Sequence, residues 1–235
     1  MILGFLSDAH GNQHGLAAGL RALQTTDASR IYFAGDSVGY LPFEELVLQQ
    51  LRDARATCIR GNHEAMLLGD LTYSQDLDAV YQIRGARQRV SAASLRWLAE
   101  WPVQFAFDVD GARILLIHGA PSNPLAGYLY PDSDLSALGD LPFDFIVCGH
   151  THRPFIRKAG ALTVVNAGSC GLPRDVGNLS SCAIIDLTSG TAEILRSTFD
   201  VDELVLAAGD AIHDSVVECL RRPRVPSMVG RIVHE

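Results

Sequence analysis

The feature that most limits how this chain can fold is the alternation of short apolar runs with amphipathic stretches along residues 1–68. The apolar runs have the length of buried strands, and they are Ile2–Leu6, Arg30–Ala34 and Thr57–Ile59. The stretches after them place apolar residues at helical spacing, and they are Gln13–Gln24, Pro42–Arg52 and His63–Leu68. Strand and helix in regular alternation predict a sheet of parallel strands covered by helices.

The second half of the chain predicts more antiparallel pairing. Asp110-Gly111 is a strong hairpin signal between two predicted strands, Val103–Asp108 and Arg113–Ile117. Further predicted strands are Phe145–Cys148, Ala161–Val165, Cys182–Leu187 and Ala192–Leu195. We expect this half to pack a second sheet onto the first, which gives an α/β fold in four layers, αββα, with two mixed sheets flanked by helices. No linker or repeat divides the chain, so we expect a single domain, 1–235, with a C-terminal helix at about 202–222.

Composition excludes several classes of protein. The chain has 235 residues, of which 48% are hydrophobic, and this is enough to build a core without disulfides. Its five cysteines are widely spaced and form no C-x-x-C pair, as is typical of a reducing compartment. The net charge of −8 disfavours DNA or an anionic membrane as a partner. The N-terminus does not resemble a signal peptide and no apolar run is long enough to span a bilayer, so we expect a cytoplasmic protein.

Acidic, amide and imidazole side chains follow the predicted strands. Asp8-Ala9-His10-Gly11-Asn12 follows the first strand, Gly35-Asp36 the second and Gly61-Asn62-His63-Glu64 the third. In the second half, His118-Gly119 and Gly149-His150-Thr151-His152 also follow strands. Because ligands bind at the carboxyl ends of parallel strands, we expect these segments to meet at one rim of the fold. Asp8 and His10 are two residues apart, so an extended chain would project both to one side.

This set of donors predicts a metal centre. Carboxylate, imidazole and amide oxygen together suit Mn²⁺, Fe, Zn²⁺ or Ni²⁺ better than Ca²⁺ or Cu. The candidates are too many for one zinc ion and fit two metals that share a carboxylate. They are Asp8, His10, Asp36, Asn62, His118, His150 and His152.

These blocks, together with Asn166–Asp175, resemble the calcineurin-like metallophosphoesterases over most of the chain, and most of all their small bacterial phosphodiesterase-like branch. The sequences that carry the resemblance are SDAHGN, GDSVGY, CIRGNHE, LIHGAP, CGHTHRP and NAGSCGLPRD. The resemblance implies an αββα sandwich with two divalent ions. Asp8, His10 and His152 would bind one ion. Asn62, His118 and His150 would bind the other, and Asp36 would bridge them. We expect Mn²⁺ first, with Fe, Zn²⁺, Ni²⁺ or Mg²⁺ as alternatives.

The resemblance also implies a mechanism, in which a hydroxide that bridges the metals attacks phosphorus in line and His63 donates a proton to the leaving group.

One block departs from the pattern of the protein serine/threonine phosphatases. Their G-D-x-V-D-R-G contains an Asp and an Arg, and this chain has Gly39 and Tyr40 at those positions. That change disfavours phosphoproteins as substrates.

Another group must then contact the phosphate. Arg60, Arg153 and Arg174 are candidates, with Arg174 favoured because it lies in the Asn166–Asp175 block, and Asn12 is a further candidate for binding substrate.

The sequence therefore predicts a dinuclear hydrolase of small phosphate esters, either a phosphodiesterase or a nucleotide phosphatase. Two segments that directly follow motifs, Gly69–Ser91 and Pro121–Pro142, are candidate walls of the site. Four tyrosines in them could stack a nucleobase, namely Tyr73, Tyr81, Tyr128 and Tyr130.

Two other functions remain open at this point. The alternative to an enzyme is a catalytically weak metal-binding scaffold or regulatory protein on the same fold, like the retromer subunit of this superfamily. The presence of every ligand together with His63 argues against it. A DNA exonuclease is disfavoured by the acidic composition. The sequence leaves the oligomeric state open.

Overall fold

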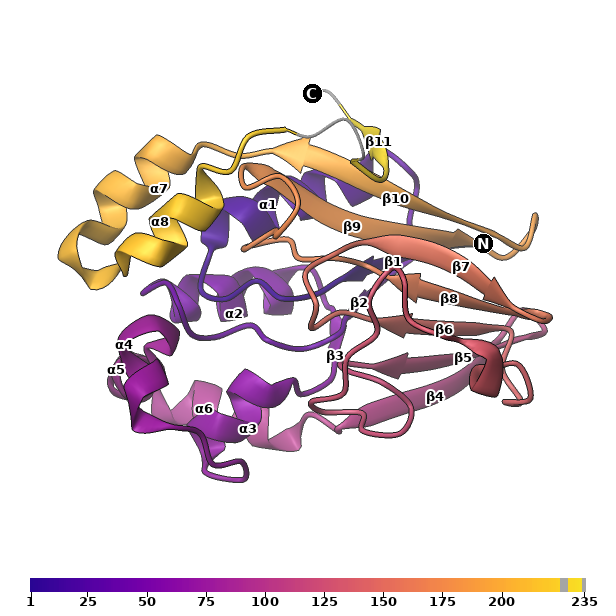
Figure 1. Ribbon diagram of the computed structural model, residues 1–235, viewed down its shortest axis with the longest axis horizontal. Helices are drawn as coiled ribbons and strands as arrows, with labels where there is room; N and C mark the ends of the chain where they lie inside the picture. Colours follow the sequence, from indigo (N-terminus) through magenta and orange to yellow (C-terminus); the bar gives the residue numbers. More distant parts are fainter. Residues whose placement is uncertain (225–227, 234–235) are drawn as a thin grey trace.

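The computed structural model of the protein describes residues 1–224 and 228–233, whose strands form two sheets packed face to face (Figure 1). In these residues the first sheet has the strand order β11-β10-β9-β1-β2-β3 and the second the order β4-β5-β6-β8-β7. The first consists of β1 (Ile2–Leu6), β2 (Arg30–Phe33), β3 (Thr57–Cys58), β9 (Leu179–Asp186), β10 (Thr191–Thr198) and β11 (Arg231–Ile232). The second consists of β4 (Gln104–Val109), β5 (Ala112–Ile117), β6 (Phe145–Cys148), β7 (Phe155–Ala159) and β8 (Leu162–Asn166).

Both sheets are mixed, as predicted. β1, β2 and β3 are parallel, and β9 joins the other side of β1 as an antiparallel neighbour. In the second sheet, β5, β6 and β8 are parallel, while β4 and β7 run antiparallel at the two edges. One expectation was wrong, because β9 and β10 belong to the first sheet and not to the second. Ile185 pairs with Leu3, and both side chains are buried in the core between the sheets.

Strand residues alternate between two cores. From β1, Leu3 and Phe5 enter the core between the sheets, whereas Leu6 enters the core under the helices. Ile114 and Leu116 of β5 likewise face the first sheet. This alternation follows from the period of two along a strand, and it explains why nearly every position of the central strands is apolar.

Helices cover the outer face of the first sheet. They are α1 (Gln13–Gln24), α2 (Glu44–Asp53), α3 (Asn62–Leu68), α4 (Asp78–Tyr81), α5 (Ile83–Arg89) and α6 (Ala92–Glu100). α1 packs closely on β1 at Gly4, where an added Cβ would lie 2.8 Å from a methyl group of Leu23. The helix predicted at Gln13–Gln24 has those bounds, and the one predicted at Pro42–Arg52 spans Glu44–Asp53. The apolar faces of both helices pack in the core beneath them, through Leu16 and Leu23 of α1 and Val47 and Leu51 of α2.

The outer face of the second sheet is covered differently from the prediction. Within the described residues, the loop that connects β5 to β6 lies over this face and contains one short 3₁₀ turn, Ser136–Leu138, but no α-helix. Leu129 and Leu135 of this loop pack on Ile146 and Leu115 of the sheet. The two-sheet sandwich is confirmed, but its fourth layer is a loop.

The C-terminal helix predicted at about 202–222 is two helices. α7 (Val201–Ala208) ends at Gly209, whose φ of 52° breaks the helix, and α8 (Asp214–Leu220) begins after a 3₁₀ turn. Both helices contribute to one apolar cluster with Ala18 of α1 and Leu172. In the described residues no helix is long and apolar enough to cross a bilayer. All five cysteines are free thiols, four of them buried.

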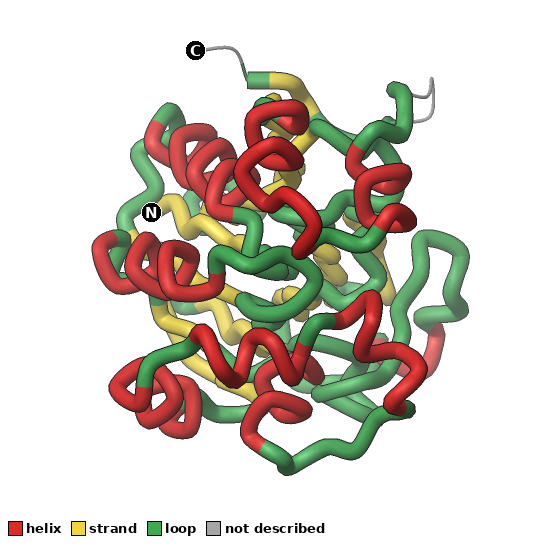
Figure 2. Tube along the Cα trace, turned by 90° about the vertical axis from the view of Figure 1, so that its left-hand side faces the viewer, coloured by secondary structure: helices red, strands yellow, loops and turns green. Residues whose placement is uncertain are grey.

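The loops that follow β1, β2, β3, β5 and β6 meet on one side of the sandwich. Figure 2 looks onto that side and shows the loops with helices arranged around them. Backbone hydrogen bonds join the loops, such as those from Asp8 N to Gly35 O (2.9 Å) and from Gly149 N to His118 O (3.0 Å). The two sheets therefore deliver their polar motifs to one place.

Candidate metal centre

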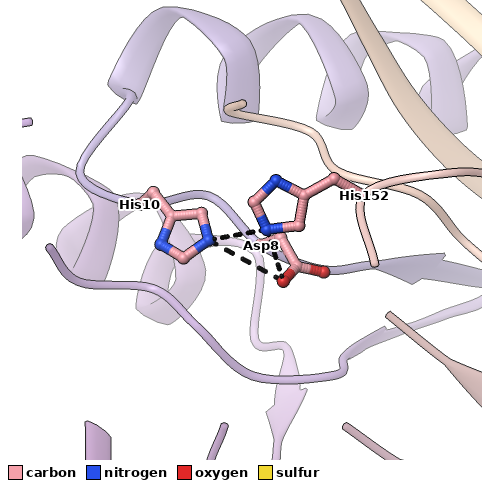
Figure 3. A group of neighbouring side chains, drawn as sticks. All are labelled: Asp8, His10 and His152. Carbon is pink, nitrogen blue, oxygen red and sulfur yellow. Dashed lines mark hydrogen bonds and ion pairs between the residues drawn. The ribbon is translucent and has the colours of Figure 1, made fainter. Parts of the chain in front are cut away.

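Three of the predicted ligands form a compact group, Asp8, His10 and His152 (Figure 3). The Nε2 atoms of His10 and His152 are 3.0 Å apart. Asp8 Oδ1 lies 3.2 Å from Nε2 of His152 and 3.8 Å from Nε2 of His10. Asp8 and His10 come from the loop after β1, and His152 comes from the loop after β6, so the group joins the two sheets.

The other four predicted ligands form a second group around His118. Its Nε2 atom is 2.9 Å from Asn62 Oδ1, 3.1 Å from His150 Nδ1 and 3.3 Å from Asp36 Oδ2. His118 follows β5 and His150 follows β6, whereas Asp36 and Asn62 come from the first sheet. All seven predicted ligands therefore lie in one cluster, in which His150 is half-buried and the others are buried.

Asp36 lies between the two groups. Its Oδ2 atom is 3.7 Å from His10 Nε2 in the first group and 3.3 Å from His118 Nε2 in the second. Its other oxygen, Oδ1, accepts a hydrogen bond from the backbone amide of His63 (2.8 Å). One carboxylate oxygen is thus held by the first turn of α3, and the other faces both groups.

Backbone carbonyls set the tautomers of three histidines. The Nδ1 contacts are His10 with Val38 O (3.2 Å), His118 with Ala34 O (2.7 Å) and His152 with Leu172 O (2.7 Å). A carbonyl only accepts, so each Nδ1 carries a proton, and in the neutral form of each ring the lone pair of Nε2 points into the cluster. Metal-binding histidines are oriented in this way in proteins.

The cluster contains polar atoms that a cation would satisfy. Two facing lone pairs only 3.0 Å apart, on His10 and His152, repel each other unless a positive charge lies beside them. Asp8 Oδ1 is buried and has no hydrogen-bond partner among the described residues. The residues present therefore fit a bound divalent metal.

Charge in the cluster points the same way. Burial raises the pKa of Asp8, but His152 and His118 outweigh it and lower this pKa to about 2. Burial lowers the pKa of His118, but Asp36 and Asp8 raise it overall to about 10. Burial lowers the pKa of His10, and it lowers that of His150 to about 4. The two carboxylates thus demand positive charge, which a proton on His118 supplies in the metal-free cluster and a divalent ion would supply when bound.

The loops hold five of the candidate ligands in the left-handed backbone region, where residues other than glycine are uncommon. The φ angles are 56° at Asp8, 49° at His10, 61° at Asp36, 64° at His150 and 57° at His152. Asp8 and His10 do come together as predicted, but the reason given for it was wrong, because neither residue is extended. Backbone strain of this kind concentrates at functional sites.

Two motif glycines allow the carboxylates to approach the backbone. A Cβ on Gly61 would lie 2.2 Å from Asp36 Oδ1, and a Cβ on Gly149 would lie 2.3 Å from Asp8 Oδ2. No side chain fits at either position without displacing a candidate ligand. These glycines belong to the site as much as the ligands do.

Sequence reasoning missed Glu64, which ties two of the loops together. Its fully buried carboxylate accepts hydrogen bonds from the amides of Gly61 (2.7 Å), Asp36 (2.8 Å) and Ser37 (2.6 Å), and from the Ser37 hydroxyl (2.8 Å). The signal was present, because Glu64 is at the third position of α3, the spacing of a capping box.

His63 is not among the seven predicted ligands, although one of its ring nitrogens lies within 4.8 Å of ligand atoms of His10 and Asp36. Its ring is stacked on Tyr40 (centroids 5.1 Å apart, planes at 20°) and also contacts Tyr81 (4.9 Å). His63 Nδ1 is buried without a hydrogen-bond partner in the described chain, and a Cβ on Gly39 would lie 2.5 Å from it. Gly39 therefore leaves room for the His63 ring, and contacts with aromatic rings, rather than a bond to a carboxylate, fix its position.

A cavity of about 150 Å³ opens at the cluster, lined by candidate ligands and by His63. Leu71 and Tyr81 of the first predicted wall segment, and Ala126 and Tyr128 of the second, also line it. Both segments therefore contribute to the walls of the cavity, as predicted.

Three of the four candidate substrate contacts differ in position. Arg174 lines the cavity, and a hydrogen bond from it opposes the rise in the pKa of Tyr40 that burial causes. Asn12 is fully buried and caps α1, accepting from Gly15 N (2.9 Å) and donating to Gly171 O (2.7 Å). Arg60 is bound instead to Asp70 (2.7 Å) and to a backbone carbonyl. Asn12 and Arg60 thus have structural roles here in place of the predicted substrate contacts.

Comparison with known proteins places this geometry in a family. The family model described as the calcineurin-like phosphoesterase superfamily domain matches residues 1–190. An uncharacterized protein of Methanocaldococcus jannaschii is 28% identical over 220 residues, covering 85% of this chain and 88% of its own. A probable metallophosphoesterase of Methanothermobacter thermautotrophicus is 34% identical over 102 residues, 42% of this chain and 55% of its own.

Among solved structures, a metallophosphoesterase from Sphaerobacter thermophilus has the same fold, with a TM-score of 0.78 and 22% identity. The likeness covers 94% of this chain and 98% of that one. The match to the family model includes every candidate ligand, from Asp8 to His152. The chain belongs to the calcineurin-like phosphoesterase superfamily and is a metallophosphoesterase, a metal-dependent hydrolase of phosphate esters.

Proposed function

We propose that the protein binds two divalent metal ions, Mn²⁺ first among them, and hydrolyses small phosphodiesters or nucleotides. The observation that carries this proposal is the position of Asp36, whose Oδ2 faces both His10 Nε2 (3.7 Å) and His118 Nε2 (3.3 Å). A carboxylate that faces two groups of donors suits a bridge between two ions. The ligands would be Asp8, His10 and His152 on one side, and Asn62, His118 and His150 on the other.

The charge of the ligands suits an anionic substrate. Asp8 and Asp36 are the only two carboxylates among the seven candidates, so two divalent ions would leave the centre positive. When bound, such ions would attract phosphate oxygens and lower the pKa of a water molecule beside phosphorus. A centre with four or five carboxylates would instead repel the phosphate.

Residues around the centre would position the substrate and transfer a proton. Arg174 lines the same cavity as His63 and would donate hydrogen bonds to phosphate oxygens. Because His63 Nδ1 is packed against Gly39, Nε2 would be the atom that gives a proton to the leaving oxygen. The amide of His63 donates to Asp36 (2.8 Å), which fixes the start of α3 and hence the ring relative to the metal ligands.

His63→Ala tests this proposal. We expect the variant to keep both metal ions, since His63 is not among the seven ligands, and to lose about 10²–10⁴-fold in turnover, as is usual for general acid catalysis. Metal content is measured by elemental analysis, and turnover with bis(p-nitrophenyl) phosphate for each of Mn²⁺, Fe²⁺, Zn²⁺, Ni²⁺ and Mg²⁺. Full activity in the variant removes His63 from the mechanism. A fully loaded wild-type protein without turnover of any phosphate ester supports the scaffold function instead.

A further inference from the structure

A second cavity, of about 550 Å³, lies directly beside the metal centre. Three arginines line it, Arg153, Arg174 and Arg222. Arg174 also lines the smaller cavity at the candidate ligands, so this one side chain forms part of the wall of both. Arg153 directly follows His152 in the sequence, and the backbone amide of Arg174 donates to His152 O (3.2 Å). The two cavities are therefore neighbours that share a wall.

None of the described residues neutralises the positive charge of this second cavity. Asp175 also lines the cavity, but its carboxylate is bound by Arg196 at 2.5 and 2.9 Å. In residues 1–224 and 228–233 no carboxylate forms an ion pair with Arg153, Arg174 or Arg222. Arg222 donates instead to the backbone carbonyl of Arg174.

The three arginines are also close to one another. Burial raises the pKa of the Cys219 thiol, and the positive charges of Arg222, Arg174 and Arg153 all oppose that rise. The chain as a whole has a net charge of −8, so three unneutralised cations around one cavity are not a consequence of a basic composition. Like charges held together without counter-charge favour an anionic ligand.

The sizes of the two cavities are complementary. The cavity at the metal centre, about 150 Å³, is below the range of small-molecule sites and leaves space for little beyond the reacting phosphate. The adjoining cavity, about 550 Å³, is within that range. A substrate longer than one phosphate would extend from the first cavity into the second past Arg174.

We propose that Arg153, Arg174 and Arg222 bind a second phosphate group of the substrate, so that the preferred substrates carry a chain of two or more phosphates. This inference rests on the proposed function, because it assigns the reacting phosphate to the metal centre. Arg174 lies between the two phosphates, and Arg153 and Arg222 contact the one that is not attacked.

Binding of inorganic tripolyphosphate to the metal-free protein tests the subsite without relying on turnover. Calorimetry in the presence of a chelator compares wild type with Arg153→Gln, Arg222→Gln and the double variant. We expect the double variant to bind tripolyphosphate at least about tenfold more weakly, because each substitution removes a charge-assisted hydrogen bond. Arg30→Gln/Arg96→Gln is the matched control, since it removes the same charge at exposed positions outside this cavity.

The outcomes separate the subsite from the proposed function. Unchanged tripolyphosphate binding in the double variant, or an equal loss in the control, overturns the subsite. Replacing Arg222 would also remove its hydrogen bond to the backbone carbonyl of Arg174 and so could weaken binding indirectly. The single variant Arg153→Gln leaves that bond intact and should still bind tripolyphosphate more weakly than wild type.

With metal bound, we expect the ratio of kcat/KM for ATP over bis(p-nitrophenyl) phosphate to fall about tenfold in the double variant, and an unchanged ratio in an active enzyme contradicts the subsite. If tripolyphosphate binding depends on the arginines but the metal-loaded protein has no turnover, the proposed hydrolase is refuted and the anion-binding site is retained.

Discussion

Replacing Glu64 measures how strongly one buried carboxylate holds the loops of the metal centre in place. Each of its oxygens accepts two hydrogen bonds. Oε1 accepts from the amide and hydroxyl of Ser37 (2.6 and 2.8 Å), and Oε2 accepts from the amides of Asp36 and Gly61 (2.8 and 2.7 Å). All four partners donate, so the carboxylate form fits this environment. Glu64→Gln preserves the shape and replaces one oxygen by a donor.

The size of the effect follows from these contacts. The glutamine NH₂ is best placed toward Ser37, whose hydroxyl can turn to accept, and the Ser37 amide then lacks an acceptor at a cost of about 1–3 kcal/mol. The two remaining bonds lose their charge assistance, about 1 kcal/mol each. Burial and the nearby charge of Asp36 raise the pKa of Glu64, so removing its charge offsets part of this loss. We expect a net loss of about 2 kcal/mol for Gln, and about 4 kcal/mol for Glu64→Ala, which leaves all four donors unpaired.

Denaturant unfolding in the presence of a chelator gives these free energies without a contribution from bound metal. Glu218→Gln is the control, because Glu218 is exposed on α8 and the substitution changes the net charge equally. Elemental analysis of the loaded variants should also show less metal, since Glu64 holds the amide of Asp36. If Glu64→Gln unfolds within about 0.5 kcal/mol of the control, the four hydrogen bonds do not stabilise the loops as argued.

Three further predictions use other parts of the structure. Asp36→Ala should leave one metal ion per chain or none, because it deletes the proposed bridge, and two ions by elemental analysis would refute the ligand assignment. Arg196→Leu should lower the free energy of unfolding by about 3–5 kcal/mol in denaturant titrations, because it leaves the half-buried carboxylate of Asp175 without its partner. A loss below about 1 kcal/mol would contradict this expectation. Tyr40→Phe should keep kcat, whereas Tyr40→Ala should lower kcat about tenfold at unchanged metal content, because only phenylalanine retains a ring stacked on His63. Equal kcat values for the two variants would show that this stacking does not position His63.

Much of the fold could be predicted because its elements are periodic. β1 and α1 have the predicted bounds, Ile2–Leu6 and Gln13–Gln24, since an apolar run and a helical stripe are unambiguous at those lengths. β7 was missed because Phe155–Ala159 is an edge strand that includes Arg157 and Lys158, whose charges conceal the strand pattern. The sheet to which a strand belongs is a long-range property, so the pairing of β9 with β1 was not available from local patterns.

The candidate ligands could be predicted because metal chemistry restricts residue types and the motifs end strands. What could not be predicted is how the backbone presents them, since the left-handed conformations of Asp8 and His10 depend on contacts with other loops, including the bond from His10 N to Asp36 O (3.0 Å). The substrate contacts were harder still. Asn12 belongs to the first motif yet caps a helix, because its side-chain oxygen accepts a hydrogen bond from the amide of Gly15 in the first turn of α1.

The strained loops that carry the candidate ligands explain why the family is recognised from the loop motifs and not from the sequences of the strands. A left-handed φ on five candidate ligands costs about 1–3 kcal/mol each, so the conformation persists only where surrounding contacts enforce it. Those contacts include Gly61 and Gly149, where any Cβ would meet a ligand carboxylate, and Glu64, whose bonds fix the amide of Asp36. Sheet positions need only be apolar and of suitable size, and many residues meet that condition. Loop positions must satisfy a backbone angle, a close approach and a ligand type at once, so few residues fit them. The motifs are therefore specific because the geometry of the candidate metal centre leaves their sequence little freedom.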